Sequence, residues 1–413
     1  MLISSYSPNW VYTQSSHTSG ALPRALMLNQ LKAELVERAR AGLQRKRRLL
    51  QSPQTAHVQL DGQSVLSFAS NDYLGLANHP ALIQALQSAA KESGVGSGAS
   101  HLINGHHQFH QEAERALADF VGLPSSLLFT TGYMANMGVI SVLMGREDAI
   151  FADKLNHASL NDAALLSRAT LHRYHHQDLQ QLATLLSQST ARRKLVVVDA
   201  VFSMDGDIAP VPELLDLCEQ YDAWLMLDDA HGFGVLGTQG RGILSHFKVQ
   251  SPRIIYMATL GKAAGVAGAF VAGDETLIEY LVQSAKTYIY TTASPPALSA
   301  ALFAAVEVMK TDLERHQHLA NLIRIFKSEL QLKHWQLMPS MTAIQPVVVG
   351  SNNNVLALSE YLLTRGIFVP AIRPPTVPKD TARLRISLSA AHTEQDVRLL
   401  IKTLQQAEAE LVA

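Results

Sequence analysis

Short apolar runs alternate with helix-like patterns from Val65 to about Thr311. Lys194–Asp199 and Trp224–Asp228 have the length and composition of buried strands, and Val211–Tyr221 between them has the period of an amphipathic helix. This alternation favours a mainly parallel sheet covered by helices on both faces. We therefore expect a large α/β domain over residues 65–310. The other expected strands are Ser125–Thr130, Ala149–Ala152, Arg253–Ala258 and Ala267–Ala272, with helices at Phe109–Phe120 and Leu160–Leu166.

The order of patterns changes after about Thr311. A long helix pattern is followed by strand and helix patterns that no longer alternate regularly, which is typical of an α+β arrangement. We expect a smaller C-terminal α+β domain over residues 311–413, and an N-terminal extension and helix over residues 1–64. The expected elements after Leu330 are Ile344–Val349, Asn354–Arg365, Leu384–Ser389 and Thr393–Val412.

The composition excludes several classes of protein. The 413 residues carry a formal net charge of −1, which gives no electrostatic basis for binding nucleic acid or an anionic membrane. Cys218 is the only cysteine, so no intrachain disulfide can form. There is no apolar run long enough to span a bilayer and no pattern typical of a secretory signal. We expect a cytoplasmic protein.

The 17 histidines include two clusters, His106-His107-x-x-His110 and His172-x-x-His175-His176. Neither has the H-E-x-x-H order or an accompanying pattern of carboxylates. The expectation from the sequence is therefore that no metal is bound.

One lysine lies where covalent chemistry is favoured. Lys262 occupies a Thr-x-Gly-Lys turn between the apolar run Arg253–Ala258 and the small-residue run Gly265–Gly273. A lysine at a strand exit among glycine and alanine loses hydration, which lowers the pKa of its amine from about 10.4. A neutral amine is what Schiff-base formation requires.

A second segment supplies the groups that such a lysine needs. The strand Trp224–Asp228 delivers Asp228 and then His231 at its carboxyl end, where α/β sheets bind ligands. An acid there can keep a pyridine nitrogen protonated, and the histidine can reach a phenolic oxygen. Together with Lys262, these residues predict a site for pyridoxal 5′-phosphate (PLP).

A set of motifs, found in one order along the chain, extends this prediction. They resemble those of the α-oxoamine synthases, PLP enzymes of the aminotransferase-like fold, over roughly Leu28 to Leu400. The resemblance implies a large domain with a mainly parallel seven-stranded sheet and a smaller C-terminal domain. The motifs are Ser70-Asn71-Asp72-Tyr73-Leu74-Gly75-Leu76, Gly96-Ser97-Gly98-Ala99-Ser100, Asn156-His157-Ala158-Ser159, Val201-Phe202-Ser203-Met204-Asp205-Gly206-Asp207, Asp228-Asp229-Ala230-His231-Gly232, Thr259-x-Gly261-Lys262 and Ala371-Ile372-Arg373-Pro374-Pro375-Thr376-Val377-Pro378.

The resemblance also implies a role for each matching residue. Lys262 would form the Schiff base and move the Cα proton, Asp228 would pair with the pyridine nitrogen, and His157 would stack on the ring. The other implied PLP ligands are His231 and Ser203 at the ring oxygen, and Gly132, Tyr133 and Thr259 at the phosphate. A further phosphate contact would come from Thr291 or Thr292 of a partner subunit, with Thr292 preferred, which implies a homodimer.

The amino-acid sequence of the proline-rich loop indicates which substrates the enzyme uses. Arg373-Pro374-Pro375-Thr376 resembles the branch that condenses L-alanine with a pimeloyl thioester to give 8-amino-7-oxononanoate and CO2 in biotin synthesis. Arg373 would bind the alanine carboxylate, since a guanidinium matches a carboxylate. The other implied substrate contacts are Arg45, Asn71 and Thr376.

Some alternatives stay open at this point. The sequence does not decide between coenzyme A and acyl carrier protein as the thioester carrier. A PLP aminotransferase and a non-catalytic PLP-binding or regulatory module are the alternative functions. The second is disfavoured, because this sequence shows no helix-turn-helix or basic DNA-binding segment before residue 28.

Overall fold

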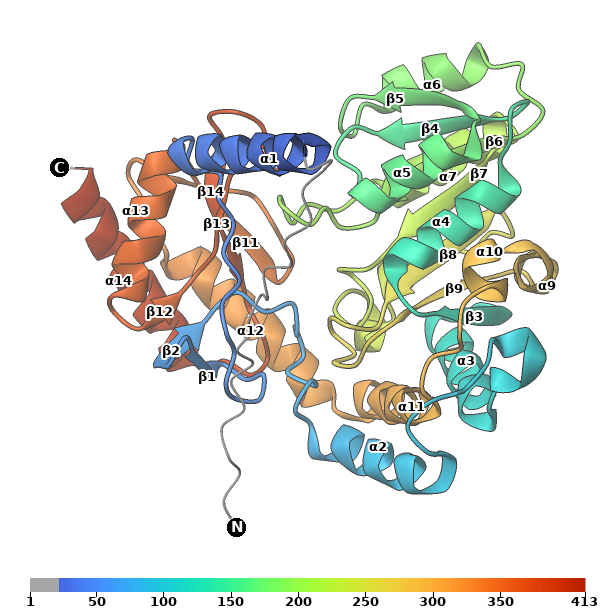
Figure 1. The fold of residues 1–413 in the computed structure, drawn as a ribbon, viewed down its shortest axis with the longest axis horizontal. Helices are drawn as coiled ribbons and strands as arrows, with labels where there is room; N and C mark the ends of the chain where they lie inside the picture. The colour runs from blue at the N-terminus through green and yellow to red at the C-terminus, as the bar shows by residue number, and fades with distance from the viewer. Residues whose placement is uncertain (1–21, 413) are drawn as a thin grey trace. The chain divides into compact units, whose positions relative to one another are not determined.

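A computed structural model describes residues 22–412, which form two units. In the first unit, residues 1–47, the helix α1 (Leu22–Arg40) coincides with the expected N-terminal helix pattern. The extension expected over Met1–Gly20 lies outside the described residues. The second unit comprises residues 48–413 and contains all the strands (Figure 1).

The large sheet has seven strands in the order β3-β9-β8-β7-β6-β4-β5. All neighbouring pairs are parallel except the two that involve β9. The predicted seven-stranded, mainly parallel sheet is therefore confirmed. Its strands are β3 (Ser125–Phe129), β4 (Ala149–Asp153), β5 (Thr170–Tyr174), β6 (Lys194–Asp199), β7 (Trp224–Asp228), β8 (Ile254–Thr259) and β9 (Ala269–Gly273).

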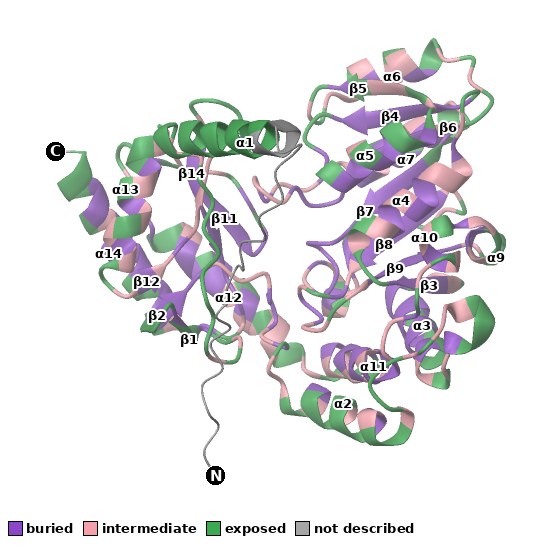
Figure 2. Cartoon of the chain, in the orientation of Figure 1, coloured by how far each residue is buried: buried purple, intermediate pink, exposed green. Residues whose placement is uncertain are grey.

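Helices cover both faces of this sheet, whose strands are largely buried (Figure 2). The strand residues alternate between two cores. In β6, Val196 and Val198 belong to one core, whereas Leu195 and Val197 belong to the other. This alternation follows from the two-residue period of a strand. Helices α4 (Gly132–Leu143), α5 (Ala158–Ser167), α9 (Glu275–Ser284) and α10 (Lys286–Ile289) pack on one face, and α2 (Pro80–Ser93), α3 (Gln108–Val121), α6 (Leu179–Ser187), α7 (Val211–Gln220), α8 (Ile243–Phe247) and α11 (Pro296–Thr311) contribute to the core of the other.

Two smaller sheets lie in the remainder of the second unit. An antiparallel sheet has the order β10-β11-β14-β13, and a three-stranded sheet joins β1 and β2 to β12. The predicted domain boundaries at residues 65 and 311 stay predictions. The elements are β1 (His57–Leu60), β2 (Gln63–Ser67), β10 (Gln336–Leu337), β11 (Ile344–Gly350), β12 (Ile367–Phe368), β13 (Ala371–Ile372), β14 (Ala382–Ser387), α12 (Leu313–Glu329), α13 (Asn352–Leu363) and α14 (Glu394–Leu411), with short η1 (His101–Gly105) and η2 (Thr238–Gly240) turns elsewhere.

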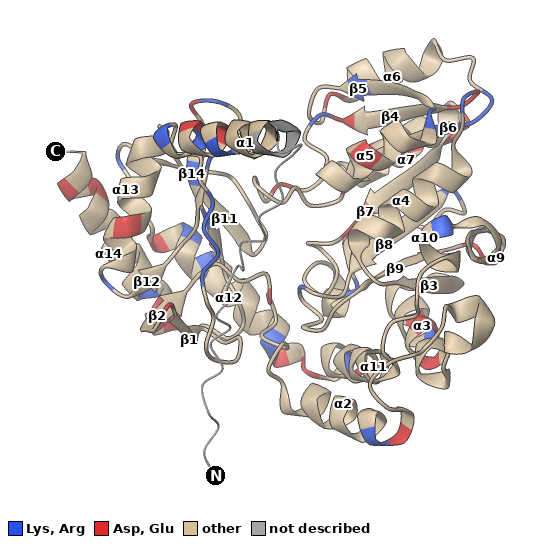
Figure 3. Cartoon of the chain, in the orientation of Figure 1, with Lys and Arg blue, Asp and Glu red and all other residues tan. Residues whose placement is uncertain are grey.

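Charged side chains are sparse in the middle of the large sheet and occur mainly at strand ends, helices and loops (Figure 3). Within residues 22–412, every helix is too short or too polar to cross a membrane. The charged strand ends are where the predicted site lies.

Candidate active site

The predicted site residues gather at the edge of the large sheet where the parallel strands end. β4, β6 and β7 end in Asp153, Asp199 and Asp228. Open α/β sheets bind ligands at this carboxyl edge, and a cavity of about 870 Å³ lies there. Its wall includes the predicted residues Asn71, His157, Ser203, His231, Lys262 and Thr376.

The amine of Lys262 lies in this wall, just after β8. Burial lowers its pKa to about 8, although the charges of Asp228 and Asp199 oppose the shift. The lowered pKa predicted from the sequence is therefore confirmed. Near neutral pH an amine of this kind is accessible in both protonation states, as nucleophilic attack and proton transfer require.

A chain of hydrogen bonds leads away from this amine. Lys262 Nζ lies 3.1 Å from His231 Nε2, and His231 Nδ1 lies 2.6 Å from the Tyr73 hydroxyl. Burial, and then the charge of Lys262, lower the pKa of His231 well below its usual value, so the ring is neutral. A neutral ring that accepts from Lys262 at Nε2 carries its proton on Nδ1 and donates it to Tyr73. The Tyr73 hydroxyl then donates to Asn71 Oδ1 at 3.1 Å.

Asp228 is buried at the end of β7 and is held by Asn136 of α4. Its Oδ2 accepts from Asn136 Nδ2 at 2.8 Å. The same amide nitrogen donates to Ser159 Oγ at 2.9 Å, and that hydroxyl lies 2.7 Å from His157 Nδ1. Asn136 therefore links Asp228 to His157.

Asp199 brings a second carboxyl group close to Asp228. Burial, and then the charge of Asp228, raise the pKa of Asp199 well above its usual value. Its Oδ2 accepts from the backbone amide of His157 at 2.6 Å. The carboxyl end of β6 thus helps to position the His157 loop.

A charged histidine joins the two loops that carry His157 and Ser203. His176 Nδ1 lies 3.1 Å from Asp153 Oδ2, and its Nε2 lies 2.8 Å from Asp207 Oδ2. Burial alone would lower the pKa of His176, but the two carboxylates outweigh it and raise the pKa to about 10. At neutral pH the imidazolium ties the end of β4 to the loop after β6.

The groups predicted to bind phosphate lie together beside the end of β8. Gly132 begins α4, and a Cβ at this position would lie 2.6 Å from Thr259 Cγ2. Only glycine allows the helix start to lie this close to Thr259. The first amides of a helix have no carbonyl partner within it and bind anions. The amides of Gly132 and Tyr133 and the Thr259 hydroxyl therefore form a suitable anion site.

Three other predicted residues, Arg373, Thr292 and Arg45, are not among the described residues that line this cavity. Arg373 is absent from that wall, although its neighbours Ile372 and Pro375 line it. Thr292 is exposed and forms a β-bridge with Ser100. Arg45 belongs to the first unit. The roles of Arg45, Thr292 and Arg373 stay predictions.

Sequence reasoning missed three residues that contact the site. Arg385 lines the cavity, is 5% exposed, and donates to Asn71 Oδ1 at 3.0 Å and to the Ser203 carbonyl at 2.5 Å. Tyr73 and Asn136 were the other two. Each had a signal: Arg385 lies in a strand otherwise rich in apolar residues, Tyr73 lies within the Ser70–Leu76 motif, and Asn136 is one helical turn after Gly132.

These groups fit PLP. The half-buried amine of Lys262, with its lowered pKa, suits an aldehyde, the carboxylate of Asp228 suits a ring nitrogen, and the start of α4 suits a phosphate. Asn161 Oδ1 on the cavity wall is buried without a hydrogen-bond partner, which leaves an acceptor for a ligand.

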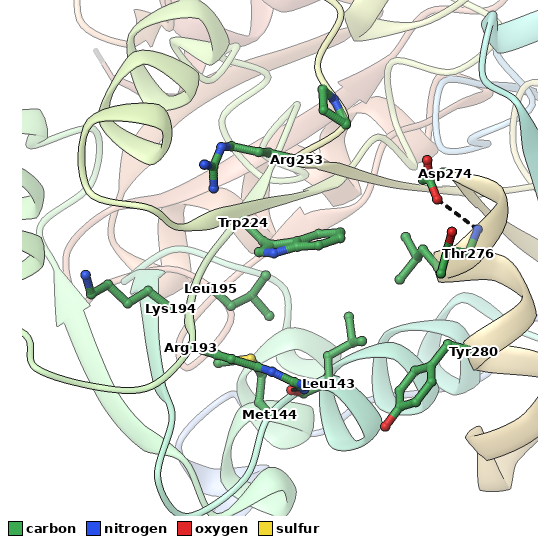
Figure 4. A pocket seen from close by; sticks show the side chains of 12 residues that line it. Leu143, Met144, Arg193, Lys194, Leu195, Trp224, Arg253, Asp274, Thr276 and Tyr280 are labelled. Atoms are coloured by element: carbon green, nitrogen blue, oxygen red, sulfur yellow. Dashed lines mark hydrogen bonds between the residues drawn. The ribbon is translucent and has the colours of Figure 1, made fainter.

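A second cavity, of about 620 Å³, lies at the opposite edge of the sheet (Figure 4). Trp224 and Lys194, at the starts of β7 and β6, line it with Tyr280 of α9. Its basic side chains are already hydrogen-bonded: Lys194 Nζ donates to the Tyr221 carbonyl at 2.8 Å, and Arg193 donates to the Leu143 carbonyl at 3.0 Å. The predicted site residues are all outside this cavity.

Comparisons with known proteins agree with this site. The model of the class I and II aminotransferase family matches residues 63–404. The 8-amino-7-oxononanoate synthase of Methylobacillus flagellatus is 63% identical over 92% of this chain and 96% of its own. That of Nitrosospira multiformis is 58% identical, again over 92% and 96%.

Solved structures of related enzymes share the fold of this chain. A serine palmitoyltransferase from S. paucimobilis, with bound PLP and myriocin, matches with a TM-score of 0.88 at 27% identity, over 94% of this chain and 98% of its own. The 8-amino-7-oxononanoate synthase of Francisella tularensis matches with a TM-score of 0.73 at 30% identity, over 84% and 99%. This chain therefore belongs to the class I and II aminotransferase family and, within it, to the 8-amino-7-oxononanoate synthases.

Proposed function

We propose that this chain catalyses the PLP-dependent, decarboxylative condensation of L-alanine with a pimeloyl thioester. The products are 8-amino-7-oxononanoate, CO2 and the free carrier, and the reaction belongs to biotin biosynthesis. The observation that carries the proposal is the half-buried Lys262 amine, of pKa about 8, in a cavity wall shared with His231 and Asn71. High identity to 8-amino-7-oxononanoate synthases over nearly the whole chain supports the substrates.

Lys262, Asp228, His231, Ser203 and His157 would hold the ring of PLP, and the Gly132 and Tyr133 amides with Thr259 would hold its phosphate. When bound, PLP supplies an aldehyde for the amino group of the donor and a ring that accepts negative charge from its Cα. The chain's own contribution is to orient these groups, exclude water and move protons.

Lys262 Nζ is the proposed proton carrier. Its pKa of about 8 lets the amine accept a proton from the donor Cα and return one later without a large cost in either direction. His231 Nε2, at 3.1 Å, accepts a hydrogen bond from the ammonium form. His231 therefore holds the amine in place while its charge changes.

Asp228 is proposed to keep the pyridine nitrogen protonated. Its carboxylate is 4% exposed, and the Asn136 amide fixes one oxygen. A charge held in a dry site and oriented before the reaction stabilises developing charge better than water does. Asn136 is a positioning residue in this scheme, since its contact is with Asp228.

The donor carboxylate has two proposed partners among the arginines. Arg373 is the partner implied by the proline-loop motif. Arg385 lies in the cavity wall and shares Asn71 with the chain that begins at Lys262. A guanidinium offers a paired hydrogen-bond geometry that matches a carboxylate.

The acyl thioester is proposed to meet Thr376 and Arg45, on coenzyme A or on acyl carrier protein. Thr376 lines the cavity. We further propose a cytoplasmic homodimer in which Thr292, or Thr291, reaches the phosphate bound by the partner subunit. The single cysteine of the chain is consistent with a reducing compartment.

The test is to incubate the purified chain with PLP, L-alanine and pimeloyl-CoA, and to detect 8-amino-7-oxononanoate by mass spectrometry. Glycine with acetyl-CoA or succinyl-CoA serves as the control for other α-oxoamine synthase reactions. Product from a control pair alone would overturn the proposed substrates. Pyridoxamine phosphate formed from alanine, with a keto acid as second substrate, would instead identify an aminotransferase.

A further inference from the structure

Three histidines outside the active site bring ring nitrogens together before α3. His101 begins η1, His106 follows η1, and His110 lies in the first turn of α3. One nitrogen of each lies within 4.8 Å of the others. Three imidazoles on one tetrahedral ion have nitrogens about 3.3 Å apart, given metal–nitrogen distances of ~2.0–2.1 Å. We propose that His101, His106 and His110 bind one divalent transition-metal ion, with Zn²⁺ as the preferred ion.

The local backbone explains why His101 and His106 can face each other. A Cβ at Gly105 would lie 2.1 Å from the Ala99 carbonyl oxygen, so only glycine permits this turn. The Gly105 amide donates to the Ser100 carbonyl at 3.0 Å, which closes it. As a result, His101 Nδ1 and His106 Nδ1 lie 2.9 Å apart. Two lone pairs at this distance require either a proton or a cation between them.

The protonation states are compatible with a metal. Burial, and then the neighbouring His110 and His106, lower the pKa of His101 to about 3. Burial also lowers the pKa of His110, against the favourable Ser294 carbonyl. Neutral imidazole is the form that binds metal ions, and nitrogen ligands suit Zn²⁺, Ni²⁺, Co²⁺ and Cu²⁺ rather than Mg²⁺ or Ca²⁺.

The outer nitrogen of His110 is held as it is in metal-bound histidines, and that of His106 faces polar groups at longer distances. His110 Nε2 donates to the Ser294 carbonyl at 2.8 Å. His106 Nε2 lies 3.4 Å from Gln111 Oε1 and 4.0 Å from Glu114 Oε2. A carbonyl or carboxylate in this position fixes the tautomer and leaves the lone pair on the inner nitrogen. The third ring, His101, is stacked on Tyr288 with a centroid distance of 4.6 Å.

Metal binding would replace one existing hydrogen bond, the one that His110 accepts from the His107 amide. With its proton on Nε2, His110 has its lone pair on Nδ1, which accepts from the His107 amide at 2.9 Å. Coordination by Nδ1 replaces this capping bond at the start of α3. Because the three ligands come together only in the folded chain, the ion should raise the thermal midpoint of unfolding.

The test uses the full-length, PLP-loaded chain without a histidine tag, freed of metal by a chelator. We expect Co²⁺ to bind with one ion per chain, to give the visible absorption of a tetrahedral centre after subtraction of the PLP spectrum, and to be displaced by Zn²⁺. The thermal midpoint should rise with Co²⁺ or Zn²⁺ but not with Mg²⁺. Absence of saturable Co²⁺ binding would overturn the proposal.

Variants then assign the ligands. His106→Gln should weaken Co²⁺ binding by about 100-fold or more, because loss of an outer partner alone costs 10- to 100-fold. His246→Gln, at an exposed histidine of α8, is the matched control and should bind as wild type does. His101→Gln removes a different ligand and should weaken binding by a similar factor, so it tests the site even if His106→Gln does not fold. Wild-type affinity in either variant would place the ion elsewhere.

Discussion

The two edges of the large sheet both carry a cavity, but they differ in chemistry. At the carboxyl edge, Asp228 and Asp199 are buried and Lys262 is half-buried. Their charges act on one another, and the pKa values of Lys262 and Asp199 are shifted. At the amino edge, Lys194 binds a backbone carbonyl, and Trp224 remains 38% exposed. Both side chains line the cavity drawn in Figure 4. The cavity volumes, about 870 and 620 Å³, are similar and do not show which cavity is the active site. Desolvated charges in mutual contact are what identify the reactive edge.

The largest expected effect is at Lys262. Lys262→Ala should lower kcat by about 10⁴-fold, because it removes the proton carrier and the nucleophilic amine. Lys194→Ala, at the other edge, should leave kcat unchanged. Borohydride reduction of the PLP-loaded enzyme, followed by peptide mapping, should place the cofactor on Lys262. A label on Lys154, which also lines the cavity, would transfer the role to that residue.

The next effect tests the buried acid. Asp228→Asn keeps the shape of the side chain but removes its charge, so the pyridine nitrogen should lose its proton near neutral pH. We expect kcat to fall by about 10²-fold, or roughly 3 kcal/mol. Asp274→Asn, in the amino-edge cavity, is the control and should keep wild-type kcat. Similar kcat values for both variants would show that the charge of Asp228 matters no more to the reaction than that of Asp274.

A smaller effect separates the two arginines. Loss of the arginine that binds the alanine carboxylate should weaken alanine binding by about 10- to 150-fold, which corresponds to ~1.5–3 kcal/mol. We expect this loss in Arg373→Ala or in Arg385→Ala, with little rescue by lysine at the same position. Titration of L-alanine, followed by the absorbance of the cofactor, measures it. Unchanged alanine affinity in both variants would mean that another group binds the carboxylate.

The smallest effect is a pH dependence of stability at His176. The pKa of His176 is about 10 in the folded chain, above its ordinary value of 6.5. Its stabilising contribution should therefore be complete below about pH 6.5 and be lost as the pH rises through about 10. We expect His176→Gln to be less stable than wild type by about 2 kcal/mol near pH 6 and by little near pH 10. Chemical unfolding of both proteins across this range is the measurement, and a difference that does not change with pH would contradict the assignment.

The local sequence pattern was sufficient to predict the central strands of the large sheet but not its outermost strand, β5. The predicted bounds of β6 and β7 agree with the structure because both strands are apolar and buried. β5 (Thr170–Tyr174) was not among the strands listed from the apolar runs, since most of it is exposed or half-buried at the sheet edge and it includes His172 and Arg173. A strand with so little burial has no apolar run to reveal it.

The site shows the same division. Lys262, Asp228 and His231 could be predicted because each lies at a strand exit in a recognisable motif. Arg385 stood out only as a charge in a strand otherwise rich in apolar residues, because its contacts with Asn71 and Ser203 join residues more than 180 positions apart. No local pattern reveals that an arginine in a distant strand faces the same cavity.

The pairing of β2 with β12 has a consequence for synthesis of the chain. Leu66 lies opposite Ile367, so the parallel partner of β2 leaves the ribosome about 300 residues later (Figure 1). At ~5–20 residues per second, this delay is about 15 to 60 s. During that time the β1–β2 hairpin exposes an unpaired edge, which is a template for wrong pairing with other chains. The nascent protein can therefore pair wrongly at this edge, and a chaperone that covers β2 during translation would protect it there.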